Sequence, residues 1–202
     1  MMDQGWLYLI VGPSGAGKDT LLDAARAYFS HSTNVVFPKR YITRPENAGG
    51  EDHLSISSKE FLQKRDAGLF AFSWKAHNLE YGVPLAINDE LSKGKSIIVN
   101  VSRSILTEAR LEYDNIRIIS ITVDQSVLRK RLRARGRENP LDIKLRLERA
   151  SAFKVSGEDV IEIDNSNSIE KSTTAFIQVI ENPYLHTLHR GSPYSRNSSS
   201  NR

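Results

Sequence analysis

The sequence predicts an α/β fold in which helices cover both faces of a parallel sheet, and three observations indicate it. Apolar runs of strand length recur along the chain. Helical patterns lie between these runs, and such alternation is typical of a parallel sheet. A glycine-rich turn joins the first apolar run to the first helical pattern, which is the setting that a phosphate-binding loop requires.

The expected elements follow in chain order. Residues 7–11 form a short apolar run, which predicts a fully buried strand. Apolar residues then recur at helical spacing, so a helix is expected to begin near Lys18. The later strands are expected at 97–101, 116–123 and 160–163, and the later helices at about 103–113, 125–135, 142–154 and 168–180.

Residues 38–95 interrupt this alternation with proline, glycine and polar clusters and several aromatic residues. They predict a substrate lobe inserted into a single domain over residues 1–181, whose core consists of 5–37 and 96–181. The charged stretch at about 134–142 separates two helical patterns and predicts a lid. Residues 182–202 are rich in Ser, Asn and Arg and contain no acid, so this tail is expected to be disordered.

Composition limits the class of protein. The chain has 202 residues, a net charge of +4 and no cysteine, which suits one soluble domain without disulfides or thiolate metal sites. No apolar run approaches the roughly 18 residues that a membrane helix needs. These features predict a cytoplasmic protein that does not interact with a membrane.

Positive charge is concentrated between residues 129 and 149, where nine Lys or Arg residues accompany three acids. A local excess of this size favours an anionic partner. Nucleotide phosphates and nucleic acid are both candidates, although no recognised nucleic-acid-binding motif accompanies the segment. The alternative is a solvated helix face.

The stretch "GPSGAGKD" at 12–19 resembles a phosphate-binding loop except at its end. Such loops usually end in Lys-Ser or Lys-Thr, whose hydroxyl ligates Mg²⁺, whereas here Asp19 follows Lys18 and Thr20 comes next. Asp19 can hold Mg²⁺ directly or through water, since Mg²⁺ prefers oxygen ligands. Alternatively Thr20 supplies the hydroxyl, or Asp19 only favours the first helical turn.

Phosphoryl transfer needs positive charge around the transferred group more than it needs covalent help. We therefore expect Lys18, Arg135 and Arg146 to act in catalysis, with Asp19 and Thr20 at the metal. The residues expected to bind ATP are Gly12, Pro13, Ser14, Gly15, Ala16, Gly17, Lys18, Asp19, Thr20, Arg131 and Arg137.

Several short motifs occur in the order of the guanylate kinase superfamily: "GPSGAGK", "TRP" at 43–45, "GED" at 50–52, "YGV" at 81–83 and "RLRARGREN" at 131–139. The chain resembles this superfamily over roughly residues 5–180. The resemblance implies a P-loop nucleoside-monophosphate-kinase fold with core, substrate lobe and lid, and a reaction that uses ATP and Mg²⁺.

The sequence departs from guanylate kinases where they read guanine. Aligned on "YGV", the base-reading Glu falls on Phe72, the acidic strand end becomes Asn100, and the Tyr of the family's "DY" pair becomes His53. The motifs "GPSGAGKD", "RYITRP", "FSWKAHNLEYGV", "VNVSR" and "RGREN" instead resemble the ribose 1,5-bisphosphate phosphokinases, a subgroup in which Asp after the loop lysine is usual.

The subgroup implies ATP-dependent phosphorylation of ribose 1,5-bisphosphate to 5-phosphoribosyl 1-diphosphate, with release of ADP, in phosphonate utilisation. A sugar with phosphates at both ends needs cations rather than carboxylates around it. The residues expected to bind it are Arg40, Arg44, His53, Tyr81, Asn100 and Arg103. Trp74 either packs on the sugar or belongs to the core.

Two alternatives remain from the sequence. One is a guanylate kinase with unusual base recognition, and the other is a non-catalytic guanylate-kinase-like interaction module. The glycine-rich loop, Lys18 and the lid arginines argue against the second. Measurable turnover of ATP with a phosphorylated acceptor distinguishes an enzyme from such a module.

Overall fold

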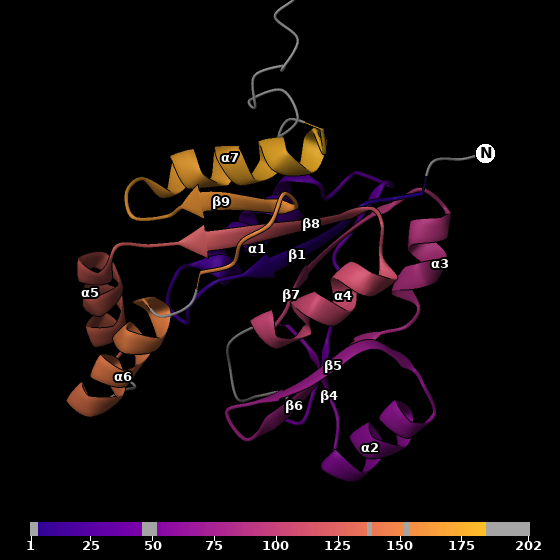
Figure 1. Ribbon diagram of the computed structural model, residues 1–202, viewed down its shortest axis with the longest axis horizontal. Coiled ribbons are helices and arrows are strands. Elements are labelled where there is room, and N and C mark those ends of the chain that lie inside the picture. Colours follow the sequence, from indigo (N-terminus) through magenta and orange to yellow (C-terminus); the bar gives the residue numbers. More distant parts are fainter. Residues whose placement is uncertain (1–3, 46–51, 137–138, 152–153, 185–202) are drawn as a thin grey trace, which may run out of the picture.

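A parallel five-stranded sheet forms the centre of the molecule (Figure 1). The structure is a computed structural model and describes residues 4–45, 52–136, 139–151 and 154–184. The strands are β1 (Leu7–Val11), β2 (Val35–Val36), β7 (Ser96–Asn100), β8 (Ile116–Thr122) and β9 (Val160–Asp164), in the spatial order β2-β7-β1-β8-β9. This arrangement confirms the predicted parallel sheet.

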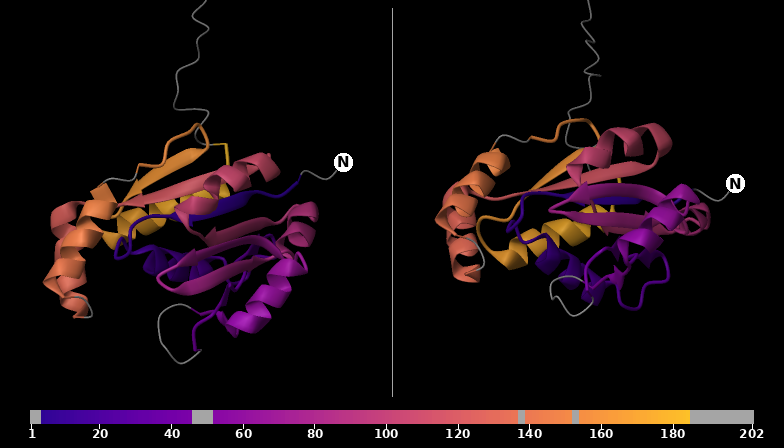
Figure 2. Two further views of the ribbon diagram at one scale, coloured as in Figure 1. Left: turned by 60° about the horizontal axis from the view of Figure 1, so that its bottom comes forward. Right: turned by 90° about the horizontal axis from the view of Figure 1, so that it is seen from below.

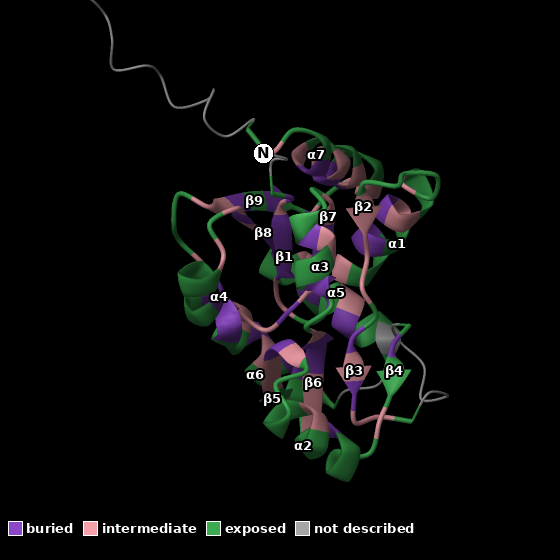
Figure 3. Ribbon diagram, turned by 90° about the vertical axis from the view of Figure 1, so that its right-hand side faces the viewer, coloured by how far each residue is buried: buried purple, intermediate pink, exposed green. Residues whose placement is uncertain are grey.

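Side chains of β1 alternate between two cores, because successive residues of a strand point to opposite faces. Leu7 and Leu9 join the core under α3 (Ile87–Ser92) and α4 (Leu106–Glu112). Tyr8 and Ile10 join the core under α1 (Lys18–Tyr28) and α7 (Ile169–Glu181). Figure 3 shows buried residues along the central strands and exposed ones on the outer surfaces of the helices. Burial on both faces explains why the strand is an uninterrupted apolar run.

The inserted segment forms a second sheet with the order β4-β3-β6-β5. Its strands are β3 (Tyr41–Ile42), β4 (Leu54–Ser55), β5 (Phe70–Ala76) and β6 (Leu79–Pro84), and α2 (Ser58–Asp66) packs against it. His77 and Asn78 form the two-residue turn of the β5–β6 hairpin, and both have positive φ, 52° and 61°. Positive φ at both positions is the geometry of a tight hairpin turn.

Helices α5 (Gln125–Arg135) and α6 (Pro140–Ser151) stand beyond the carboxyl ends of the central strands (Figures 1 and 2). They pack on each other through an apolar cluster of Leu128, Leu132, Ile143 and Leu147. The helix expected from about 142 begins earlier because Pro140 suits the first helical turn. Much of the predicted lid belongs to these two helices, and residues 137–138 lie outside the described chain.

The expected strands and helices of the core are present, and their ends differ from the expected positions by at most three residues. The helix expected at 103–113 is a 3₁₀ turn, Arg103–Ile105, followed by α4. The two-residue strand β2 and the helices α2 and α3 were not predicted. Of the expected tail, residues 185–202 lie outside the described chain. Among the described residues, no helix is both long and apolar enough to cross a lipid bilayer.

Candidate active site

The phosphate-binding loop joins β1 to α1 at the carboxyl edge of the central sheet. Gly17 precedes α1 with φ 93°, a left-handed conformation that glycine adopts without strain. A Cβ there would lie 2.3 Å from Asn165 Nδ2, so a larger residue would also collide with the chain behind the loop. Gly12 approaches β8 so closely that a Cβ would lie 2.5 Å from the Ile121 carbonyl oxygen.

Lys18 lies over the beginning of this loop. Its ammonium group donates hydrogen bonds to the carbonyl oxygens of Gly12, at 2.8 Å, and Pro13, at 3.0 Å. The side chain lines a cavity together with the loop. The expected phosphate-contacting cation is therefore at the mouth of the loop, in reach of an anion bound there.

Asn165 and Arg131 support the loop from behind. Asn165 is 1% exposed and donates from Nδ2 to the carbonyl oxygen of Ala16 at 2.7 Å. Arg131 donates to the same carbonyl at 3.3 Å and to the Asn165 carbonyl at 2.8 Å. The other side-chain atom of the amide, Asn165 Oδ1, is buried without a hydrogen-bond partner among the described residues, so this acceptor beside the loop is unsatisfied.

Arg146 reaches the loop from α6. Its Nη1 donates to Ser14 Oγ at 2.8 Å, which places a second guanidinium at the phosphate-binding loop. The side chain of Arg135 and all of Arg137 lie outside what the structure describes, so their expected roles remain predictions. The α5–α6 pair therefore contributes Arg131 and Arg146 to the site.

A cavity of about 320 Å³ lies between the loop and the inserted lobe. Its cationic side chains are Lys18, Arg40 and Arg103, and Asp19 is the one carboxylate among the described residues that line it. Burial lowers the pKa of the Arg103 guanidinium, which still stays far above neutral pH. The full lining is Gly12, Pro13, Ser14, Gly15, Gly17, Lys18, Asp19, Arg40, Trp74, Ala76, His77, Tyr81, Asn100, Val101, Ser102 and Arg103.

The lobe contributes an aromatic wall to this cavity. The rings of Trp74 and Tyr81 are parallel, with centroids 5.3 Å apart. The guanidinium carbon of Arg40 lies 5.6 Å from the Trp74 centroid and 5.5 Å from the Tyr81 centroid. Arg40 is only 6% exposed, so these ring contacts belong to a guanidinium that is largely shielded from water.

Phe72, where the sequence leads us to expect the base-reading position of guanylate kinases, belongs to the core. It is 1% exposed and contacts the Tyr113 ring at 5.4 Å between centroids. It packs in the same apolar cluster as the central strands. A buried phenylalanine at this position offers no hydrogen-bond acceptor to a base.

Arg44 and His53 pair with each other within the lobe. Arg44 Nη2 lies 3.4 Å from His53 Nδ1, and His53 Nε2 lies 3.2 Å from the Arg44 carbonyl oxygen. A neutral ring with its proton on Nε2 satisfies both contacts. Neither residue lines the loop cavity, and their expected contact with substrate remains a prediction. Arg44 Nε is buried and without a hydrogen-bond partner among the described residues.

A neighbouring cavity of about 250 Å³ shares Asp19, Arg40 and Asn100 with the loop cavity. Asp19 and Asn100 thus line both spaces, whereas Thr20 is exposed and lines neither. In the part of the chain that the structure describes, no three His, Asp or Glu side chains are grouped to hold a metal ion. A metal here would depend on ligand oxygens and water as well as on protein.

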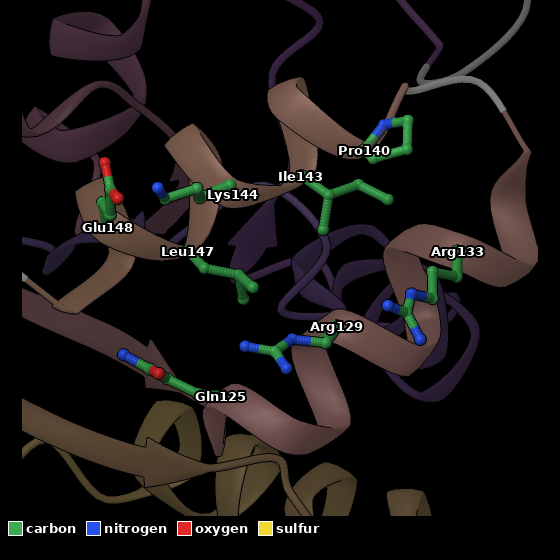
Figure 4. Close-up of a pocket in the computed structure, with 8 residues that line it drawn as sticks. All are labelled: Gln125, Arg129, Arg133, Pro140, Ile143, Lys144, Leu147 and Glu148. Atoms are coloured by element: carbon green, nitrogen blue, oxygen red, sulfur yellow. The ribbon is translucent and has the colours of Figure 1, made fainter.

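A larger cavity, of about 540 Å³, lies between α5 and α6 and away from the loop (Figure 4). Its cations are Arg129, Arg133 and Lys144. Arg131 and Arg146 are two positions away from these residues along the same helices, so they lie on the opposite helix faces. The loop cavity, not this groove, contains the predicted site.

Sequence reasoning missed Asn165 and did not decide between two roles for Trp74. Asn165 follows β9 directly, and a polar residue at the carboxyl end of a buried parallel strand is a signal that could have found it. Trp74 was left between a sugar contact and core packing. Its position directly opposite Tyr81 depends on the hairpin register, which the sequence did not reveal.

Comparisons with known proteins agree with this geometry. The family description "Guanylate kinase" matches residues 4–183. The chain is 42% identical to "Ribose 1,5-bisphosphate phosphokinase PhnN" of Rhizobium etli (strain CIAT 652), over 89% of this chain and 91% of that protein. It is 44% identical to the protein of the same name from Agrobacterium fabrum (strain C58 / ATCC 33970), over 87% of this chain and 96% of the relative.

Among solved structures, guanylate kinase from Anaplasma phagocytophilum is similar with a TM-score of 0.63. The similarity covers 91% of this chain and 88% of that one, at 19% sequence identity. At this identity the likeness supports the fold alone.

Proposed function

The chain belongs to the guanylate kinase family and is a phosphotransferase, and from this we propose that it phosphorylates ribose 1,5-bisphosphate with ATP. The products would be 5-phosphoribosyl 1-diphosphate and ADP, in phosphonate utilisation. The observation that carries the proposal is the acceptor side of the loop cavity. On this side, the nearly buried Arg40 contacts two aromatic rings. Phe72, at the position expected to recognise guanine in guanylate kinases, is instead buried in the core.

Charge supports a sugar bisphosphate as the acceptor. The cavity has three cationic side chains and one carboxylate among its described lining residues. Two phosphate groups bring about four negative charges near pH 7, since each has a second pKa of about 6. Guanidinium groups match phosphate oxygens in geometry as well as in charge.

ATP fits the loop side of the same cavity. Successive backbone N–H groups at the N-terminus of α1 suit its phosphates, and Lys18 and Arg146 supply positive charge there. We propose that residues 12–20 and Arg131 hold ATP, with Arg135 and Arg137 completing the set from α5 and the segment after it.

Mg²⁺ also fits, because Asp19 and Asn100 line both cavities and their side chains carry oxygen donors, which Mg²⁺ prefers. Such a cation neutralises charge on the β- and γ-phosphates when it is bound and usually keeps several waters. Asp19 is better placed than Thr20 to hold it or its water, since Thr20 lines neither cavity.

The chemistry needs little from the protein beyond position and charge. An oxygen of the acceptor's 1-phosphate attacks the γ-phosphorus of ATP, and a new P–O bond forms as the bond to the β–γ bridging oxygen breaks. The attacking phosphate is already anionic at neutral pH, so it requires no general base. Lys18, Arg103 and Arg146 would stabilise the charge on the transferred group.

The reaction is tested by identifying its product. Purified protein supplied with ATP, Mg²⁺ and ribose 1,5-bisphosphate should release one ADP for each acceptor consumed. The product should be a substrate for a phosphoribosyltransferase, which would release pyrophosphate from it. ADP release without such a product would contradict the proposal.

Replacing Asp19 by asparagine should raise the Mg²⁺ concentration needed for half-maximal activity by about tenfold, with a smaller change in the KM for ATP. The expected cause is loss of the carboxylate that holds the metal or its water. Asp66→Asn is the matched control, since Asp66 is an exposed acid that pairs with Arg65 in the lobe and lines neither cavity. An unchanged Mg²⁺ titration in Asp19→Asn would leave this side chain only a favourable interaction with the helix terminus.

A further inference from the structure

Arg40, Trp74 and Tyr81 form a three-membered group at the lobe side of the loop cavity. The guanidinium carbon and the two ring centroids are mutually separated by 5.3 to 5.6 Å. The backbone of Arg40 is also fixed, because its carbonyl oxygen accepts a hydrogen bond from Leu54 N at 2.8 Å. The group is therefore anchored in both the main chain and the side chains.

The hairpin register determines the ring positions. Trp74 in β5 is directly opposite Tyr81 in β6, and side chains of such pairs are close neighbours on one face of a sheet. The tight turn at His77 and Asn78 links the two strands three residues beyond Trp74. A two-residue turn fixes the register of the two strands. The two rings are therefore held face to face before any ligand binds.

Ring contacts position a guanidinium while leaving its positive charge in place. A cation within about 6 Å of an aromatic centroid is attracted by the ring, most strongly where water is excluded. Arg40 meets this distance to two rings and is 6% exposed. A side chain with many rotamers is thereby restricted to one region of the cavity wall, which suits the recognition of an anion at a fixed place.

The other acceptor-side cation shares two cavities with the start of the phosphate-binding loop. Arg103 lines the loop cavity and a smaller one of about 120 Å³ together with Gly12 and Pro13. Arg40 shares only the loop cavity with these two residues, and its second cavity is lined by Asp19 and Asn100 as well as by Pro38 and Asp52. The phosphate that attacks ATP must lie at the loop. The opposite end of the same sugar therefore points toward Arg40.

We propose that Arg40 binds the 5-phosphate of the acceptor and that Trp74 is the positioning residue that holds Arg40 for it. The inference rests on the proposed function, because it assigns the two ends of that substrate within the cavity. Trp74 would not touch the transferred group. Its loss should therefore weaken acceptor binding more than it slows the chemical step.

The experiment uses two fragments of the acceptor as competitive inhibitors of ribose 1,5-bisphosphate phosphorylation. Ribose 5-phosphate carries only the phosphate assigned to Arg40, and ribose 1-phosphate carries only the phosphate assigned to the loop end. In Trp74→Leu, the inhibition constant of ribose 5-phosphate should rise about tenfold, as expected for loss of a desolvated cation–π contact. The constant for ribose 1-phosphate should stay within about twofold.

Three further variants make the result specific. Trp74→Phe keeps an aromatic ring and should retain most of the affinity for ribose 5-phosphate. Trp6→Leu removes a tryptophan that contacts Arg117 at 4.4 Å, away from the cavity, and should change neither constant. In Arg40→Gln, adding Trp74→Leu should have little further effect, because the two residues act through one contact.

Equal weakening of both fragments in Trp74→Leu would mean that Trp74 only maintains the shape of the cavity, and it would overturn the inference. Weakening of ribose 1-phosphate alone would reverse the assignment of the two ends, and no change in either constant would remove the role of Trp74. If the wild-type protein does not phosphorylate ribose 1,5-bisphosphate, the proposed function fails separately. Calorimetric binding of the two fragments would then still show whether Trp74 acts on the 5-phosphate.

Discussion

Replacing Lys18 by alanine should lower kcat by about two to three orders of magnitude and leave the fold intact. One preorganised charge aimed at the transferred group typically contributes a factor of this size. The ammonium group lies at the mouth of the loop and donates to the carbonyl oxygens of Gly12 and Pro13. Its loss removes positive charge from the place where negative charge accumulates during transfer.

Lys59→Ala is the matched control, since Lys59 is an exposed lysine of α2 in the lobe and should not affect kcat. Circular dichroism and the thermal midpoint of unfolding would show that Lys18→Ala is folded. A kcat within about twofold of wild type would mean that the phosphate-binding loop is not where the chemistry occurs.

Ribose 1,5-bisphosphate should be a far better acceptor than GMP, with a kcat/KM ratio of roughly 10⁴. A site that hydrogen-bonds its substrate can discriminate on this scale when the competitor leaves polar groups unpaired. The donors on guanine would meet the rings of Trp74 and Tyr81, at a cost of about 1–3 kcal/mol for each unsatisfied group. The sugar bisphosphate has no base to desolvate.

Both acceptors should be measured side by side with the same protein, ATP and Mg²⁺. Turnover of GMP equal to or better than that of the sugar would instead establish a guanylate kinase with unusual base recognition. Restoring the aligned glutamate by Phe72→Glu is not a useful reverse test. Phe72 is 1% exposed in the core, and an unpaired carboxylate there would destabilise the fold.

The helices and strands that could be predicted are those whose buried residues leave a clear apolar pattern in the sequence. β1 is buried on both faces and therefore reads as a continuous apolar run, and the glycine-rich loop follows it at once. The short strand β2 has two half-buried residues, too few to show any period. Helix α2 buries only Phe61, so its apolar spacing is faint. Such elements depend on tertiary packing more than on local preference.

The residues of the candidate site that belong to one sequence motif could be predicted. The residues that come together from distant segments were harder to predict. Lys18 and Asp19 are adjacent to the loop in sequence. Asn165 reaches Ala16 across 149 residues, and no spacing rule connects them. Trp74 joins Arg40 only through strand register and ring packing. Pairings of this kind are decided by the tertiary structure.

The central position of β1 has a consequence for how the protein is made. β1 leaves the ribosome first, yet its two neighbours in the sheet are β7 and β8, which end at Asn100 and Thr122. Such pairings between distant segments form late, because the intervening chain must be closed into a loop first.

The phosphate-binding loop therefore lacks its supports during much of synthesis. The last of its partners to emerge are Arg131, Arg146 and Asn165. Their side chains donate hydrogen bonds to Ala16 or Ser14 of the loop. A nascent chain that stops before residue 165 contains the whole loop motif but not the contacts that fix its shape. Nucleotide can thus stabilise the newly made protein only after residue 165 has been translated.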